Sequence, residues 1–148
     1  MTSLINKITT TTAGLDTLPL RAGAGVIFAA HGGQKLFGWF GGYGLEGTAG
    51  WMASMGLEPG LLMAAMAGGA EFFGGLLLIA GLMVRPAALV LAITMVVAIV
   101  TVHLSNGLFL ANNGYEFGLA LLAVSVGLVF RGAGSFSADR FLQTQLAK

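Results

Sequence analysis

Five ionisable side chains lie inside long apolar stretches of this sequence, where a charge is expensive. They are His31, Lys35, Glu71, His103 and Glu116. A charged group at the centre of a bilayer costs roughly 2.5–3.5 kcal/mol on insertion scales, so such groups normally pair inside a helical bundle. Two carboxylates, one ammonium group and two imidazoles can form a nearly neutral network that binds a polar ligand or moves protons. The residue types therefore predict a buried site, although they identify no catalytic group.

The spacing of these residues predicts that they lie at a similar depth. Counted at ~1.5 Å per residue from the expected cytoplasmic ends of the helices, their heights fall between ~18 and ~25 Å, in the outer half of a membrane. Gln34 shares a helix face with His31 and Lys35, because the three are separated by three and four residues. The structural alternative is that the same network only holds the helices together.

The same residues argue against two kinds of redox centre. The expected heights of His31 and His103 differ by ~7 Å, and the charged neighbours suit an apolar porphyrin poorly, which disfavours haem. A metal bound by the histidines and glutamates is chemically reasonable, but Lys35 at the same depth opposes a second cation. The chain contains no cysteine, which excludes thiolate ligands and disulfides. We expect no metal and no covalently bound cofactor.

The elements that position these residues are expected to lie in lipid. Of the 148 residues, 56% are hydrophobic and 9% are charged, whereas a soluble domain has about 25% charged residues. Four apolar blocks can each span, or nearly span, a hydrocarbon core of ~30 Å: about 18–40, 61–84, 86–103 and 114–130. The sequence predicts an all-α, four-helix transmembrane bundle. A net charge of +1 without a basic run excludes nucleic acid as a partner.

The distribution of basic residues predicts the orientation of the chain. Lysines and arginines flank one end of the blocks, at Lys7, Arg21, Arg85, Arg131, Arg140 and Lys148, and none occurs in loops 39–60 and 104–113. The positive-inside rule then places both termini in the cytoplasm. The expected parts are a lead-in over 1–17, a membrane domain over 18–131 and a tail over 132–148. Arg21 and Arg85 are expected to reach lipid headgroups.

The first outer loop is long and aromatic. A short helix over about 48–57 would place Trp51, Met52 and Met55 on one side, as an amphipathic segment at the membrane interface. The simpler interpretation is an aromatic anchor, and the alternative is a lid over a cavity. The 24 glycines include the spaced pairs Gly38–Gly42 and Gly114–Gly118, which favour close helix packing or a homo-oligomer face.

Four longer stretches form a recognisable set that covers about residues 18–131. They are Arg21 with GVIFAAHGGQKLFGWF, then GTAGWMASMGLEPG, AEFFGGLLLIAGLMVRPAAL, and His103 followed by NGYEFGLALL. Together they resemble the DoxX family of small bacterial membrane proteins. The resemblance implies four spans in the bacterial inner (cytoplasmic) membrane. Some members resemble the small subunit of a thiosulfate:quinone oxidoreductase and others are associated with oxidative-stress complexes, but the family supplies no catalytic mechanism.

The leading hypothesis is a quinone- or small-ligand-interacting subunit of a membrane redox system. His31 and Lys35 would donate hydrogen bonds to one quinone carbonyl and His103 to the other, with Glu71 and Glu116 as proton relays. The sequence has no motif for an electron carrier, so electrons would come from a partner redox protein; a homo-oligomer is the other expected assembly. The alternatives are a proton-coupled small-molecule carrier and a non-enzymatic scaffold for assembly.

Overall fold

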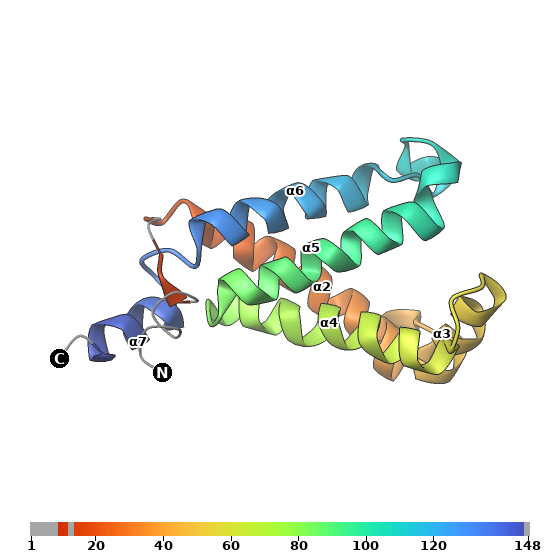
Figure 1. Cartoon of the computed structure of the whole chain (residues 1–148), viewed down its shortest axis with the longest axis horizontal. Helices are drawn as coiled ribbons and strands as arrows, with labels where there is room; N and C mark the ends of the chain where they lie inside the picture. The colour runs from red at the N-terminus through yellow and green to blue at the C-terminus, as the bar shows by residue number, and fades with distance from the viewer. Residues whose placement is uncertain (1–8, 12–13, 147–148) are drawn as a thin grey trace.

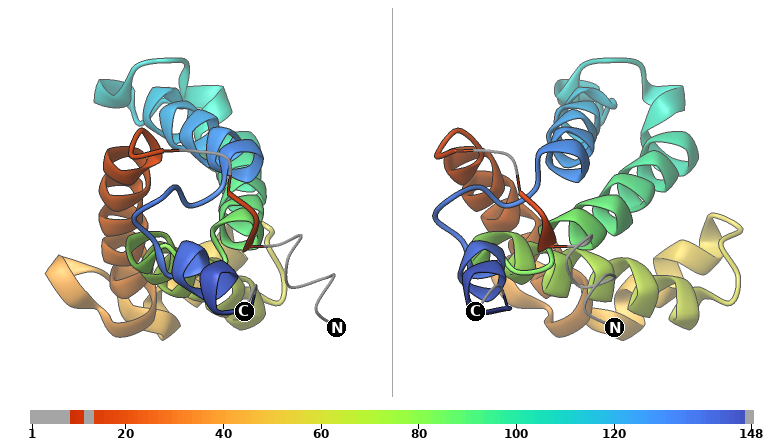
Figure 2. Two further views of the ribbon diagram at one scale, coloured as in Figure 1. Left: turned by 90° about the vertical axis from the view of Figure 1, so that its left-hand side faces the viewer. Right: turned by 60° about the vertical axis from the view of Figure 1, so that its left-hand side comes forward.

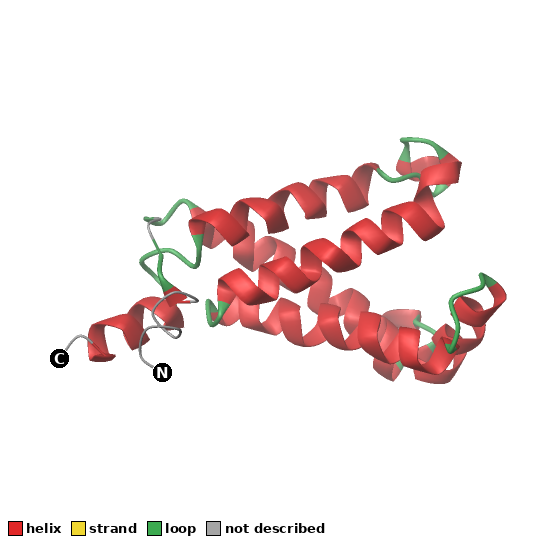
Figure 3. Cartoon of the chain, in the orientation of Figure 1, coloured by secondary structure: helices red, strands yellow, loops and turns green. Residues whose placement is uncertain are grey.

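The computed structural model describes residues 9–11 and 14–146, and within them the regular elements are all helical (Figure 3). The four long helices are α2 (Thr17–Phe37), α4 (Gly60–Ala80), α5 (Val84–Ala98) and α6 (Glu116–Arg131). The shorter elements are η1 (Trp39–Gly41), α3 (Gly44–Ser54), η2 (Ile99–His103), η3 (Leu104–Asn106), η4 (Leu110–Asn112) and α7 (Ala138–Leu146). The all-α prediction is confirmed.

The long helices pack as two pairs, α2 with α4 and α5 with α6, joined by contacts between α4 and α5. The start of α2 and the whole of α7 lie at one end of the bundle, and α3 and the 104–115 connection lie at the other (Figure 1). At this second end the two pairs diverge, so that α3 and the 104–115 connection are far apart in every view (Figure 2). The predicted helix in the first long connection is present, but it begins at Gly44 and ends at Ser54.

Among residues 9–11 and 14–146, two helical segments are long and apolar enough to cross a membrane, Gly60–Ala80 and Val84–Asn106. Only 33% and 28% of their most apolar windows is buried inside the chain. Large apolar side chains such as Phe73, Ile93 and Val100 are therefore about 60% exposed, at 61%, 57% and 62%. A continuous apolar surface of this kind fits a lipid environment, because soluble monomers rarely expose one.

Glycines allow the backbones of α2 and α4 to touch. A Cβ atom added at Gly25 would lie 2.7 Å from the carbonyl oxygen of Gly75, and one added at Gly32 would lie 2.7 Å from that of Gly68. Real Cβ atoms do not approach this closely, so these positions accept only glycine without a shift of a helix. Close packing within one chain thus occurs at these glycines.

The two spaced glycine pairs singled out in the sequence have other roles. Gly38 lies just beyond the C-terminus of α2 in the left-handed conformation, with φ of 72°, and its partner Gly42 follows η1. Gly114 precedes α6, and a Cβ atom there would collide with the backbone of Leu108 in the same connection. Gly38, Gly42 and Gly114 therefore shape connections. Gly118 lies within α6, where an added Cβ would be 3.1 Å from Ile99 Cγ1, so in this pair only the second glycine lies at a contact between helical segments.

Arg21 joins three parts of the chain at the end where α2 begins. It is 2% exposed, and its Nε and Nη1 donate to the carbonyls of Ala133, Leu78 and Ile79 at 3.0, 2.9 and 2.7 Å. Its Nη2 donates to the carbonyl of Phe136. The expectation that Arg21 reaches lipid headgroups is wrong, because the side chain is buried and four backbone carbonyls take its hydrogen bonds instead.

Arg85 also bonds to the backbone. It is half-buried, and its Nε and Nη1 donate to the carbonyls of Thr10 and Val129, both at 2.7 Å. Arg85 therefore joins the start of α5 to the end of α6 and to the chain before α2, in place of the expected contact with lipid headgroups.

Asp139 caps the N-terminus of α5 from the segment expected to be a tail. Its two carboxylate oxygens accept hydrogen bonds from the backbone N–H groups of Met83 at 2.7 Å and Val84 at 3.1 Å. The negative charge also complements the positive end of the helix dipole. Asp139 is 1% exposed, and this burial raises the pKa of its carboxyl above the ordinary 3.8 despite the hydrogen bonds and the nearby arginines.

The glycine contact generates the first prediction. Gly75→Ala should lower the free energy of unfolding by about 1–3 kcal/mol, because overpacking forces the helices apart. Gly69→Ala is the matched control on the same helix, since no atom lies within 4 Å of a Cβ there. Reversible unfolding in mixed micelles measures both. Equal effects at the two positions would show that α2 and α4 do not touch as described.

The burial of Asp139 generates the second prediction. Because its pKa is higher in the folded chain than in the unfolded chain, its contribution to stability is fully present below about pH 3.8 and is lost as the pH rises through the raised value. The melting temperature of the wild type should therefore fall with rising pH relative to Asp139→Asn, which cannot titrate. Thermal unfolding from about pH 4 to about pH 7 measures the difference. Parallel curves would contradict the assignment.

Candidate functional site

An ion pair between α2 and α4 forms the centre of the candidate site. The Lys35 ammonium donates a hydrogen bond to Glu71 Oε2 at 2.6 Å. Glu71 is buried, at 4% exposed, whereas the Lys35 side chain is 24% exposed. Such charge-assisted hydrogen bonds are about twice as strong as neutral ones. Of the five ionisable residues expected to form one network, the structure pairs these two directly.

The local sequence makes room for this pair. Lys35 lies in the last turn of α2, where a positive charge complements the negative end of the helix dipole. Opposite it on α4 stands Gly68, and a Cβ there would lie 3.2 Å from Lys35 Cβ and 2.8 Å from a methyl carbon of Leu36. A larger residue at 68 would displace the stem of Lys35. The glycine therefore lets the ammonium reach Glu71, one turn further along α4.

A cavity of about 260 Å³ opens beside Lys35. Its lining residues are Gln34, Lys35, Gly41, Gly42, Tyr43, Thr48 and Trp51. They come from the end of α2, the connection through η1 and the first two turns of α3. The Thr48 hydroxyl donates to the carbonyl of Lys35 at 3.3 Å, which ties α3 to α2 across the cavity.

The cavity contains three of the residues selected from the sequence: Gln34, Lys35 and Trp51. Trp51, which is 43% exposed, forms part of its wall. The two methionines expected beside it lie elsewhere: Met52 is buried at 7% exposed, and Met55 follows the end of α3 and is 39% exposed. Of the three residues considered for a lid, only Trp51 therefore lines the cavity.

Sequence reasoning missed Tyr43 and Thr48 as lining residues. The signal for Thr48 was its position three residues before Trp51, which places the two on one face of a helix. Tyr43 precedes α3 directly and is 82% exposed, so nothing in its spacing distinguished it from an aromatic anchor.

His31 lies one turn before Lys35 on α2 and points towards α6. Its ring centroid is 6.3 Å from that of Phe117, with the planes tilted by 51°. The residue is exposed on the bundle surface. No hydrogen bond within residues 14–146 links it to the Lys35–Glu71 pair.

His103 and Glu116 stabilise the 104–115 connection. His103 Nδ1 lies 2.9 Å from the carbonyl oxygen of Asn113, and Glu116 Oε1 accepts a hydrogen bond from the backbone N–H of Leu110 at 2.6 Å. The structure thus divides the predicted five-residue network, because the α2–α4 and α5–α6 pairs diverge at this end (Figure 1). The expected heights were similar, but height along a helix does not determine the direction in which a side chain points.

The arrangement can bind a small molecule with a polar head. An ammonium has three donor hydrogens, and Glu71 accepts one from Lys35. The Gln34 amide can both donate and accept, and the rings of Tyr43 and Trp51 offer flat apolar surfaces. Among the residues that the structure describes, no group of three or more metal-ligating side chains comes together.

Comparison with known proteins agrees with the resemblance found in the sequence. The DoxX family profile matches residues 17–104, which include α2, α3, α4 and α5. A protein of Bacillus subtilis (strain 168) named "Putative oxidoreductase CatD" is 34% identical over 128 residues, which are 86% of this chain and 87% of that protein. No solved structure gives a significant match. The profile covers more than half of the chain, and the Bacillus subtilis relative matches most of it. The chain therefore belongs to the DoxX family of membrane-associated proteins.

Proposed function

We propose that this protein is a four-span subunit of a redox system in the bacterial inner membrane, and that it binds a quinone or a small ligand of similar polarity. The observation that carries the proposal is the cavity in which Gln34, Lys35 and Trp51 meet beside the buried carboxylate of Glu71. The name of the Bacillus subtilis relative, an oxidoreductase, supports the same class of function.

Helix length and charge support the four-span topology. At ~1.5 Å per residue, the 21 residues of α2 extend ~31 Å and the 16 residues of α6 extend ~24 Å. The bundle end that contains α7 has four arginines, Arg21, Arg85, Arg131 and Arg140, against Asp16 and Asp139. The opposite end has Glu46, Glu58 and Glu116. By the positive-inside rule the α7 end faces the cytoplasm.

The size of the cavity limits what it accepts. At about 260 Å³ it is slightly smaller than the ~300–1,000 Å³ of sites for drug-sized ligands. A quinone ring fits between the aromatic walls, and an isoprenoid tail would have to leave the cavity along the apolar helix surface into lipid. The two remaining N–H groups of Lys35 and the Gln34 amide would then donate to a carbonyl oxygen of the ring.

Lys35 and Glu71 could also take part in the proton transfers that accompany quinone reduction. Reduction to the quinol takes two electrons and two protons, one for each oxygen. Lys35 holds one proton at the cavity, and the ionised Glu71 behind it stabilises the ammonium. Lys35 would give this proton to one quinone oxygen and regain one that Glu71 takes up from water, while the second oxygen would take its proton from water at the mouth of the cavity. The electrons would come from a partner redox protein. His103 and Glu116 form hydrogen bonds within the 104–115 connection and take no part in the proposed quinone site.

The proposed topology generates a third prediction, and the absence of native cysteines makes it simple to test. A membrane-impermeant maleimide applied to spheroplasts should label Ser54→Cys and Ala111→Cys, which lie in exposed positions at the outer end. It should label Gln145→Cys only after lysis. Labelling of Gln145→Cys in intact spheroplasts would overturn the cytoplasmic position of the C-terminus, and protection of either outer site would contradict four spans.

The fourth prediction concerns ligand binding. The chain has two tryptophans, Trp39 and Trp51, so Trp39→Phe leaves only the tryptophan in the cavity wall. A short-chain ubiquinone should quench its fluorescence. Lys35→Met should weaken this binding by about 10- to 100-fold, the value of one hydrogen bond to a charged group. Glu46→Gln, an exposed acid on α3 outside the cavity lining, is the control and should bind as the parent does.

Stability measurements on the same variants separate a site from a structural pair. Lys35→Met leaves Glu71 buried and unpaired, which should cost up to about 3 kcal/mol, less than the ~3–5 kcal/mol of a fully buried pair because Lys35 is partly exposed. The double variant Lys35→Met/Glu71→Met should recover most of that stability but not ligand binding. Unchanged quenching in the stable double variant would refute the proposed site. No quenching in the parent would favour a scaffold.

A further inference from the structure

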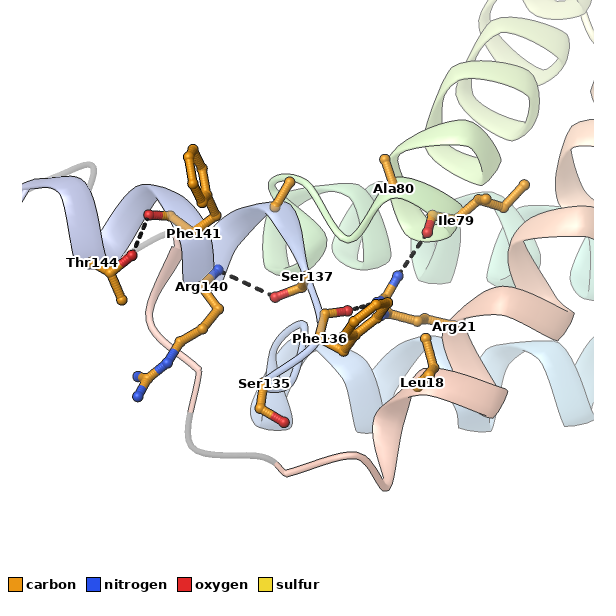
Figure 4. A pocket seen from close by; sticks show the side chains of 11 residues that line it. Leu18, Arg21, Ile79, Ala80, Ser135, Phe136, Ser137, Arg140, Phe141 and Thr144 are labelled. Carbon is orange, nitrogen blue, oxygen red and sulfur yellow. Dashed lines mark hydrogen bonds between the residues drawn. The ribbon is translucent and has the colours of Figure 1, made fainter.

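A second cavity lies at the opposite end of the bundle, between α7 and the helices that it covers. Its volume is about 510 Å³, and its walls include Leu18 and Arg21 from α2, Ile79 from α4, and Phe136, Arg140 and Phe141 from the C-terminal segment. Figure 4 shows these side chains, with Arg140 and Phe141 extending from opposite sides of α7, Arg21 beyond Phe136, and Ser135 and Ser137 in the connection before α7. None of these residues belongs to the proposed quinone site.

The polar part of this cavity is cationic. The guanidinium of Arg21 bonds only to carbonyls, and neither it nor Arg140 lies within 4.0 Å of a carboxylate among residues 9–11 and 14–146. Asp139, the nearest acid in sequence, directs its oxygens to the backbone of Met83 and Val84. Arg21 and Arg140 therefore line different parts of the cavity, with the Ser135 hydroxyl also in its wall, and neither arginine has a directly bonded anion.

The rest of the wall is apolar and open to the surroundings. Phe136 and Phe141 are 72% and 64% exposed, and Leu18 and Ile79 line the inner side. A soluble anion gains no contact energy from apolar walls. An amphiphile with a charged head and hydrocarbon chains complements both the polar and the apolar part of the cavity. The cavity also lies at the arginine-rich end of the bundle (Figure 1), where a membrane surface carries anionic headgroups.

We propose that this cavity binds an anionic phospholipid. The phosphate accepts hydrogen bonds from Arg140 and from the hydroxyl of Ser135, and the acyl chains run along Phe141, Leu18 and Ile79. Arg21, held in place by its own hydrogen bonds, adds positive charge at another part of the cavity wall. A bound lipid would thereby join α7 to α2 and α4, beside the Asp139 cap. The site is independent of the ligand cavity at the other end.

Native mass spectrometry of the full chain in neutral detergent tests this proposal, with phosphatidylglycerol and phosphatidylcholine as probes. The wild type should bind phosphatidylglycerol in preference. Arg140→Gln should weaken that binding about five-fold, since one basic group near a membrane surface contributes about 1 kcal/mol, and Arg140→Lys should retain most of it. Arg131→Gln is the control, because Arg131 lies at the same end, is exposed and pairs with Asp16 outside the cavity.

Three results would overturn the proposal. Equal binding of the two lipids would indicate unspecific annular lipid, and equal losses in Arg140→Gln and Arg131→Gln would indicate only a diffuse positive surface. Displacement of the lipid by millimolar inorganic phosphate would indicate a site for a soluble anion. The double variant Lys35→Met/Glu71→Met should bind phosphatidylglycerol as the wild type does, so failure of the quinone proposal and failure of this one are distinguishable.

Discussion

The direct contact between the backbones of α2 and α4 is the constraint on which both ends of the molecule depend. Gly25 and Gly32 on one helix meet Gly75 and Gly68 on the other. At the end near α3 this spacing lets Lys35 reach Glu71, and at the end near α7 it lets the same helix bring Arg21 to the last carbonyls of α4. If the helices were separated by one side-chain layer, neither set of polar contacts would form, and the groups would be left unpaired in an apolar layer.

The turn between α4 and α5 shows how charge is matched to helix ends. Arg21 lies at the C-terminus of α4, where carbonyls accumulate partial negative charge, and Asp139 lies at the N-terminus of α5, where N–H groups accumulate partial positive charge. Both charges are buried, yet each is satisfied by backbone rather than by the other. This arrangement holds α2, α4, α5 and α7 together at one end of the bundle, and it leaves the cavity beside α7 with a positive lining.

The helices were predictable from the sequence, because apolar block length is local information. The sequence also placed Lys35 and Glu71 at similar depths, but it did not select this pair from the five ionisable residues. The roles of Arg21 and Asp139 were not predictable, since their partners lie 57–115 and 55–56 residues away in the chain. His103 and Glu116 show a different limit. Their heights were estimated, but the direction of each side chain depends on how α5 and α6 rotate and diverge, which periodicity in a uniformly apolar helix does not reveal.

The hydrogen bonds of α2 to the chain after α6 have a consequence for biosynthesis. Thr17 and Arg21 donate to the carbonyl of Ala133 across 116 and 112 residues. Because a ribosome makes α2 before the segment that holds Ala133, Arg21 lacks this acceptor until 112 further residues have been added. Until then its guanidinium needs other partners such as water or lipid headgroups, and this end of the bundle closes only when the chain around Ala133 has been made.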